Sequence, residues 1–232
     1  NDRIETNHSR NFVLIGTAGA DSTIFDAQNV GRHFYLDDGQ TDSTVIKGIT
    51  FKHGMADNTF GYGGGGSIYI GQNTHVSFVD CVWDSNYVKD YYHGGAISIY
   101  ATANPSFTGC VFKNNYAQHT TAGTYGGAVW INSPGSKEQL NKAIVFKQTK
   151  FIGNYVVAKH SAYGGAVYAD RSTEFINCLF VKNYTIGGED ANVNDGHDSF
   201  GGAIHSQPSW WSGDGYEAGT MKIVNSTFHG NY

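Results

Sequence analysis

One motif recurs five times in this chain of 232 residues: two glycines, a small residue and a β-branched residue. The copies begin at Gly65, Gly94, Gly126, Gly164 and Gly201. Each copy is followed by a second motif, in which an aromatic residue precedes two variable residues, an Asn and a Tyr. Paired motifs that return at intervals of roughly 30–50 residues predict a solenoid, because each repeat buries its apolar side chains against the next one.

The composition favours strands over helices. Aromatic residues make up 14% of the chain and charged residues only 15%. Tyr, Phe, Val and Ile pack well in sheets, and this composition argues against disorder. The net charge is −5 and the basic residues are dispersed, so we expect no nucleic-acid partner. No run of 18 apolar residues occurs, so we expect this segment not to insert into a membrane.

Alignment of the repeats on the aromatic residue of the second motif places large apolar residues in two columns. The aligned segments are 78–83, 107–112, 146–151, 175–180 and 223–228. In a β-solenoid, equivalent residues of successive turns lie about 4.8 Å apart, so each column becomes a stack inside the coil. The predicted aromatic stack contains Phe112, Phe151, Phe180 and Phe228. Cys81, Cys110 and Cys178 share one column and are predicted to be buried free thiols rather than a disulfide framework.

The Asn of the second motif is predicted to form a ladder of its own. Its five copies are Asn86, Asn115, Asn154, Asn183 and Asn231. Each stands where a strand must turn, and Asn tolerates left-handed backbone angles and bonds to nearby backbone groups through its side chain. Stacked Asn side chains can also bond one another along the axis. The Gly pair suits another corner, where φ is positive or two chain segments come close.

We therefore expect residues 1–232 to form a single domain, an all-β right-handed parallel β-helix without end caps, within a longer chain. Right-handed crossovers are the rule between parallel strands. Polar inserts occur at 133–142, 185–199 and 206–219, and such loops on a rigid rod often carry function. The only helix signal lies at 136–143.

The paired motif Gly-Gly-Ala-(Ile/Val) and Phe-x-x-Asn resembles the repeat of the chlamydial polymorphic outer membrane proteins and of similar bacterial and archaeal adhesin-like surface proteins. The resemblance covers residues 61–232 and, more loosely, the segment before them. Two units deviate, with Ser67 in place of Ala and Trp83 in place of Phe. The resemblance implies a secreted right-handed parallel β-helix that mediates attachment at a surface, as the passenger of a larger membrane-anchored chain.

Other β-helices are polysaccharide lyases, hydrolases and epimerases, so an enzyme is an alternative hypothesis. A site like that of pectate lyases would need clustered Arg residues, and the four Arg residues of this chain are dispersed. A site like that of polygalacturonases would need a series of acidic elements, of which only Asp37-Asp38 and a partial Gly196-His197-Asp198 occur. We interpret Asp37-Asp38 as a solvated turn and assign no catalytic residue.

One insert holds a candidate metal site. Asp190, Asn192 and Asn194 alternate like the first ligands of a calcium loop, and Asp195 and Asp198 follow closely. Hard oxygen donors at alternate positions suit Ca²⁺, which is therefore the candidate cofactor. The bidentate Glu that closes such a loop is missing, and a plain acidic loop is the alternative interpretation.

A second insert holds a candidate ligand-binding pair, Trp210 and Trp211. Adjacent Trp residues in a polar loop can stack on sugars or anchor a protein partner. The alternative is that one of them covers the apolar end of the rod.

Three functions follow from these observations. The leading hypothesis is a non-catalytic, extracellular adhesin-like or structural segment at the cell surface that attaches to a surface protein or glycan. The second is a carbohydrate-active β-helix enzyme. The third is a subunit of a surface filament, which would self-assemble through the open strand edges at the ends of the coil.

Overall fold

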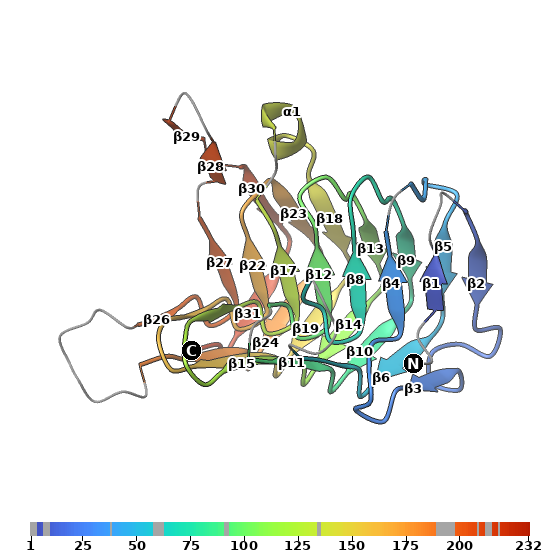
Figure 1. Cartoon of the computed structure of the whole chain (residues 1–232), viewed down its shortest axis with the longest axis horizontal. Coiled ribbons are helices and arrows are strands. Elements are labelled where there is room, and N and C mark those ends of the chain that lie inside the picture. The colour runs from blue at the N-terminus through green and yellow to red at the C-terminus, as the bar shows by residue number, and fades with distance from the viewer. Residues whose placement is uncertain are drawn as a thin grey trace.

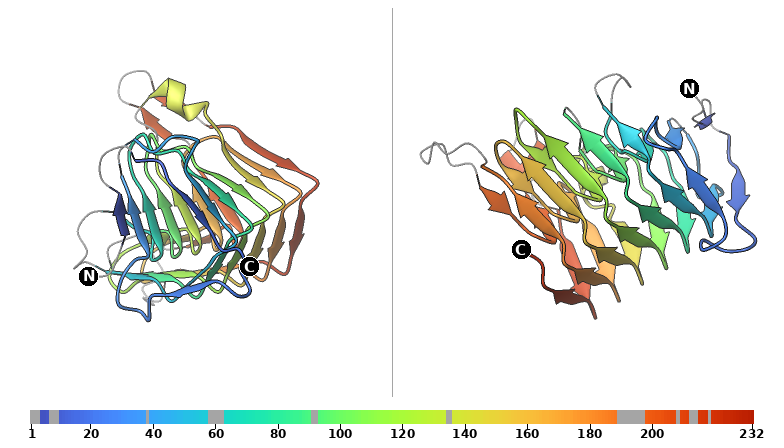
Figure 2. Two further views of the ribbon diagram at one scale, coloured as in Figure 1. Left: turned by 90° about the vertical axis from the view of Figure 1, so that its right-hand side faces the viewer. Right: turned by 90° about the horizontal axis from the view of Figure 1, so that it is seen from below.

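Each turn of the chain adds one strand to each of several parallel sheets that run along a rod (Figure 1). The computed structural model describes residues 4–6, 10–37, 39–57, 63–90, 93–133, 136–188, 198–207, 209–211, 215–217 and 219–232. In Figure 2, strands of successive turns lie behind one another in the left view and side by side in the right view. The predicted parallel β-helix is thus confirmed.

Three sheets enclose the main interior of the rod. Sheet A contains β1 (Ile4–Thr6), β4 (Phe34–Leu36), β8 (Ile68–Ile70), β12 (Ile97–Ile99), β17 (Val129–Ile131), β22 (Val167–Ala169) and β27 (Ile204–Ser206). Sheet B contains β2 (Val13–Ile15), β5 (Val45–Lys47), β9 (Ser77–Val79), β13 (Ser106–Thr108), β18 (Ile144–Lys147), β23 (Thr173–Ile176) and β30 (Met221–Val224). Sheet C contains β3 (Ile24–Asp26), β6 (Thr50–Lys52), β10 (Val82–Asp84), β14 (Val111–Lys113), β19 (Lys150–Ile152), β24 (Leu179–Val181) and β31 (Thr227–His229).

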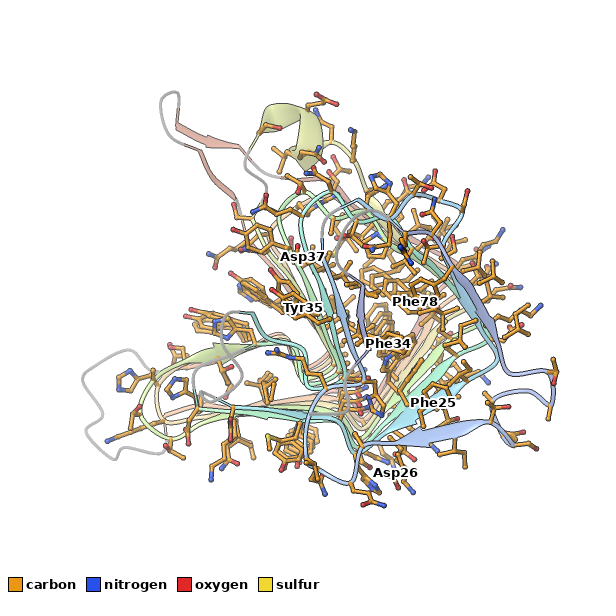
Figure 3. The ribbon with its side chains drawn as sticks, turned by 45° about the vertical axis from the view of Figure 1, so that its right-hand side comes forward. Phe25, Asp26, Phe34, Tyr35, Asp37 and Phe78 are labelled. Atoms are coloured by element: carbon orange, nitrogen blue, oxygen red, sulfur yellow. The ribbon has the colours of Figure 1, made fainter. Side chains whose placement is uncertain are left out.

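Two shorter sheets form an arm that extends from one corner of the rod (Figure 3). Sheet D contains β7 (Met55–Ala56), β11 (Tyr87–Lys89), β15 (Tyr116–His119), β20 (Tyr155–Ala158) and β25 (Tyr184–Ile186). Sheet E contains β16 (Thr124–Tyr125), β21 (Ala162–Tyr163) and β26 (Ser199–Phe200). A separate small core of Ala and Val side chains lies in this arm, and these small residues let its two layers approach closely. The chain then returns from sheet E to the next strand of sheet A.

The predicted aromatic stack fills the main interior. Trp83, Phe112, Phe151, Phe180 and Phe228 follow one another on sheet C with ring centroids 4.6–5.0 Å apart and interplanar angles of 4–6°. A second stack on sheet B contacts the first edge-to-face and consists of Phe78, Phe107, Phe146 and Phe175. Offset stacking and edge-to-face contacts are both favourable for aromatic rings. The column of Cys81, Cys110 and Cys178 is buried and its thiols are free, as predicted.

The Asn ladder is also confirmed, and its hydrogen bonds are complete. The Asn115 side-chain oxygen accepts from the backbone N–H and the side-chain amide of Asn86, at 3.0 and 2.9 Å. The Asn115 amide donates to the Trp83 carbonyl and to the side-chain oxygen of Asn154. The same pattern repeats along the ladder to Asn231. Every donor and acceptor of such a carboxamide is therefore satisfied inside a dry interior.

One detail of the predicted corner is wrong. The ladder asparagines do not adopt left-handed backbone angles; the residue before each one does, at Ser85, Asn114, Gly153, Lys182 and Gly230, with φ between 53° and 62°. The turn is made one residue earlier, so that the Asn side chain can point inward and bond along the axis.

The two glycines of the first motif serve different purposes. The first glycine of each pair has a positive φ, between 64° and 78°. The second lies against the next turn: a Cβ on Gly127 would stand 2.0 Å from the Gly165 carbonyl oxygen and 2.5 Å from that of Tyr155. No side chain fits at such a distance, so this position must be glycine for lack of space.

The predicted helix at 136–143 is present but shorter. Helix α1 (Lys137–Leu140) begins after Ser136, whose hydroxyl accepts from the Gln139 backbone N–H. It lies at the outer rim of the rod, where β17 connects to β18 (Figure 1).

Candidate ligand-binding face

Of the five predicted calcium ligands, the structure describes Asp198. Asp190, Asn192, Asn194 and Asp195 lie outside the described residues. Asp198 is exposed beside β26, and its backbone carbonyl accepts from the Ala162 N–H. Within the described ranges, no group of three or more His, Cys, Asp and Glu residues is arranged to hold a metal ion.

The predicted Trp pair lies on a hairpin that projects from the end of the rod (Figure 1). Strands β28 (Ser209–Trp211) and β29 (Gly215–Glu217) pair antiparallel, with Trp210 opposite Tyr216 and Trp211 opposite Gly215. The side chains of this hairpin lie outside the described part of the structure.

The outer surface of sheet A carries a pattern that the sequence analysis missed. The middle residues of β4, β8, β12, β17, β22 and β27 are in register and point away from the interior; they are Tyr35, Tyr69, Ser98, Trp130, Tyr168 and His205. Glu5 of β1 pairs with Tyr35 at the end of this column. Two residues further on, the same side carries Asp37, Gly71, Tyr100, Asn132, Asp170 and Gln207. Figure 3 shows Tyr35 and Asp37 pointing outward and Phe34 pointing inward. An aromatic column therefore runs beside a column rich in planar polar side chains.

Sheet E faces this surface across the corner between rod and arm. Its outward residues are Tyr125, Tyr163 and Phe200. The Tyr125 ring lies 4.7 Å from that of Tyr168, and the Tyr163 ring lies 5.0 Å from that of His205. We call the two outer columns of sheet A, together with these three residues, the aromatic face.

His93 contributes a further ring at the same corner. Its imidazole lies 4.4 Å from the Tyr125 ring and 5.0 Å from the Trp130 ring. Its Nδ1 is within hydrogen-bond distance of the Thr124 hydroxyl, at 3.1 Å. Burial lowers the pKa of His93 to about 3. The ring is therefore neutral over the whole physiological range.

Asp170 is the carboxylate closest to the centre of this aromatic surface. Burial raises its pKa to about 6, and a hydrogen bond from the Tyr168 hydroxyl opposes that rise. Burial and the nearby Asp170 charge both raise the pKa of Tyr168, which is 3% exposed. Asp170 is thus ionised at neutral pH but only partly hydrated, which strengthens its interaction with any polar or charged group that approaches.

The next residue fixes where Asp170 points. Arg171 is buried, and its Nη1 donates to the carbonyls of Ala101 and Ala103 at 2.8 and 2.9 Å. Its Nη2 donates to the Lys142 carbonyl at 2.7 Å. Asp170 directly follows β22, and its backbone N–H donates to the Ile131 carbonyl at 3.1 Å, which holds it beside the neighbouring strand β17. The buried Arg171 therefore anchors the bend that carries Asp170.

Such a surface suits carbohydrate chemistry. Aromatic rings offer flat apolar surface to the C–H faces of sugars, while planar amides and carboxylates bond to hydroxyl groups. Two turns carry both elements with a partly exposed ring: Trp130 with Asn132, and His205 with Gln207. On the turn between them Asp170 follows Tyr168, whose ring is buried.

Asp37 and Asp170 are not placed for hydrolysis by two carboxylates. Asp37, the other Asp of the outer columns of sheet A, lies four turns from Asp170, which is roughly 19 Å at one strand spacing per turn. Inverting glycosidases hold their carboxyl groups roughly 6.5–9.5 Å apart and retaining ones closer still. The two Asp residues of these columns therefore do not form such a pair.

A comparison of the chain with known protein families, with curated proteins and with solved structures finds no significant match. No helix among the described residues is long and apolar enough to span a bilayer.

The sequence did contain a signal for this face. The residue directly after the first motif is aromatic in four of its five copies: Tyr69, Trp130, Tyr168 and His205, with Ser98 as the exception. Its neighbours on both sides point into the rod, so a large ring at this offset must lie outside. The Phe and Asn columns that point inward do not by themselves predict which residues lie on the outer surface.

Proposed function

We propose that this chain is a non-catalytic, extracellular segment of an adhesin-like surface protein, and that it attaches to a polysaccharide lying along the aromatic face. The observation that carries the proposal is the repetition of ring and polar side chain on successive turns of sheet A. The same kinds of side chain recur on this surface about every 4.8 Å. A polymer of repeated sugar units can therefore bind to several turns at once.

Two further observations support the proposal. The repeat motif resembles that of surface proteins that mediate attachment. Asp37 and Asp170, the two Asp residues of the outer columns of sheet A, are also four turns apart, which is too far for them to act together in hydrolysis.

The proposal is tested by comparing two outward aromatic residues on different faces. Trp130→Ala removes a half-buried ring from the aromatic face, and Tyr155→Ala removes a half-buried ring from the outside of sheet D. Wild type and both variants are applied to an array of neutral and amino-sugar polysaccharides, after circular dichroism shows that each is folded.

We expect Trp130→Ala to lower glycan affinity roughly tenfold or more, as loss of a central aromatic anchor does, and Tyr155→Ala to leave it unchanged. Equal loss in both variants would mean that the aromatic face is not the binding surface. No bound glycan with the wild-type protein would contradict the proposal itself.

A further inference from the structure

One histidine side chain holds the loop at the tip of the arm. His119 is the last residue of β15, and its side chain is only 13% exposed. Its Nδ1 accepts hydrogen bonds from the backbone N–H groups of Thr121 and Ala122, at 3.3 and 3.0 Å. Peptide N–H groups can only donate, so Nδ1 must carry a lone pair and Nε2 the proton. The neutral imidazole therefore closes the loop between β15 and β16.

A carboxylate of the preceding turn lies beside this imidazole. Asp90 Oδ1 is 3.8 Å from His119 Nδ1. The same oxygen accepts from the backbone N–H and the hydroxyl of Thr120, at 2.6 and 2.7 Å. Burial raises the pKa of Asp90, but the bonds from Thr120 outweigh burial and hold that pKa below its usual value. An ionised acceptor is therefore within reach of the imidazole when Nδ1 becomes a donor.

We propose that His119 is a pH-sensitive latch for the tip of the arm. Once Nδ1 takes up a proton from water, it can no longer accept from Thr121 and Ala122. The imidazolium donates to Asp90 instead, while Thr120 stays bonded to the same carboxylate. Residues 121–123 are thereby released, and Thr120 remains the fixed end of the opened loop.

The released residues lead directly into sheet E. The Thr124 hydroxyl, at the start of β16, lies 3.1 Å from His93 Nδ1, and the His93 ring packs against Trp130. On the other side, the Ala122 carbonyl accepts from the His160 backbone N–H of the next turn, at 3.3 Å. Opening the latch therefore frees the tip from the next turn and weakens the support of the corner between arm and rod. This device does not depend on what the aromatic face binds.

The groups around His119 set the direction of the switch. Burial lowers the pKa of His119, the Asp90 charge opposes that shift, and His160 adds to it. His93 stays neutral because its pKa is about 3. Lys159 is the cationic residue of the next turn, and its backbone N–H donates to the His119 carbonyl at 2.9 Å. The closed tip is therefore most stable above pH 6.5, and its stability falls as the pH falls below that value.

The test follows the tip by NMR between pH 7.5 and pH 4.5. It records the His119 ring signals, the Ala122 amide shift and the protection of that amide against hydrogen exchange. His119→Asn keeps a side-chain acceptor close to the position of Nδ1 but cannot be protonated. His75→Asn is the matched control, because His75 Nδ1 also lies near a carboxylate, that of Asp42 at 3.4 Å, but on the rod rather than the arm.

In wild type we expect the Ala122 amide shift to follow protonation of the His119 ring, with a midpoint below pH 6.5. Protection of the Ala122 amide, corrected for the intrinsic pH dependence of exchange, should fall by roughly tenfold or more between pH 7.5 and pH 4.5. Protection of the Thr120 amide should fall much less. His119→Asn should keep Ala122 protected at both pH values, and His75→Asn should behave as wild type.

Three results would overturn the latch. In the first, the His119 ring titrates while Ala122 stays protected, so that protonation leaves the loop closed. In the second, the midpoint lies above pH 6.5, so that the folded tip favours the imidazolium. In the third, His119→Asn loses protection as wild type does, although it has no imidazole to titrate. The first two are measured on wild type alone and decide the matter even if His119→Asn does not fold.

Discussion

At the scale of single residues, the ladder asparagines are the most tightly constrained positions, because every hydrogen-bonding group of their side chains has a partner. Asn115 is fully buried, yet both of its amide hydrogens and its oxygen have partners on the neighbouring turns. A buried amide without partners would cost several kcal/mol, so the ladder is favourable only while it is unbroken. This explains why the same residue type recurs at this position.

We therefore predict a large difference between two adjacent asparagines. Asn115→Ala removes the acceptor of the Asn86 backbone N–H and of one Asn86 amide hydrogen, and one donor to the Trp83 carbonyl. It should lower the free energy of unfolding by roughly 3–5 kcal/mol. Asn114→Gly changes an exposed residue with φ of 56°, and should change stability by less than about 1 kcal/mol. Urea unfolding followed by circular dichroism measures both. Similar losses in the two variants would contradict the importance of the ladder.

At the scale of strands and corners, the stacked interior could be predicted from the sequence and the outer faces could not. The Phe and Asn columns were predictable because a residue buried between two copies of itself must recur at a fixed position. The aromatic face is not under that constraint: Ser98 replaces a ring there without breaking the register. The arm was missed because its length differs between turns and its Ala and Val residues give little pattern.

The corner glycines give a second prediction, because Gly127 is required by lack of space and Gly153 by its positive φ. Gly127→Ala would place a methyl group 2.0 Å from the Gly165 carbonyl oxygen, and should cost roughly 3 kcal/mol or more through displaced backbone. Gly153 has φ of 62°, and a Cβ there would meet only the far end of one flexible side chain, the Asn114 oxygen at 3.2 Å. The equivalent residue one turn earlier is Asn114 itself.

Gly153→Asn should therefore cost no more than about 1 kcal/mol, since Asn tolerates the left-handed region. Thermal melting of the two variants beside wild type makes the comparison. If Gly127→Ala proved as stable as Gly153→Asn, the close approach of successive turns at this corner would be refuted.

At the scale of the whole molecule, stability against acid is set by histidines that are buried in the neutral form. Burial lowers the pKa of His33 to about 4 and that of His93 to about 3. An unfolded His takes up its proton near pH 6.5, so between that pH and the folded value the unfolded chain binds more protons. Stability contributed by these histidines is fully present above pH 6.5 and falls as the pH falls. Asp170 acts in the opposite direction between its unfolded value near 4 and its folded value of about 6. Burial also lowers the pKa values of His119 and His205, which add to the effect of His33 and His93.

The last prediction uses this balance. Each buried His should remove about 2 kcal/mol of unfolding free energy between pH 6.5 and pH 5, at 1.36 kcal/mol for each pH unit. His93→Phe keeps an aromatic ring between Tyr125 and Trp130 but cannot be protonated. The variant should therefore lose about 2 kcal/mol less than wild type when urea unfolding is repeated at pH 5. His229→Gln, at an exposed position on β31, should follow the wild-type dependence. The same pH dependence in His93→Phe as in wild type would contradict this prediction. It would mean that His93 is accessible to protons in the folded protein, and that the corner between rod and arm is open to water rather than filled by rings.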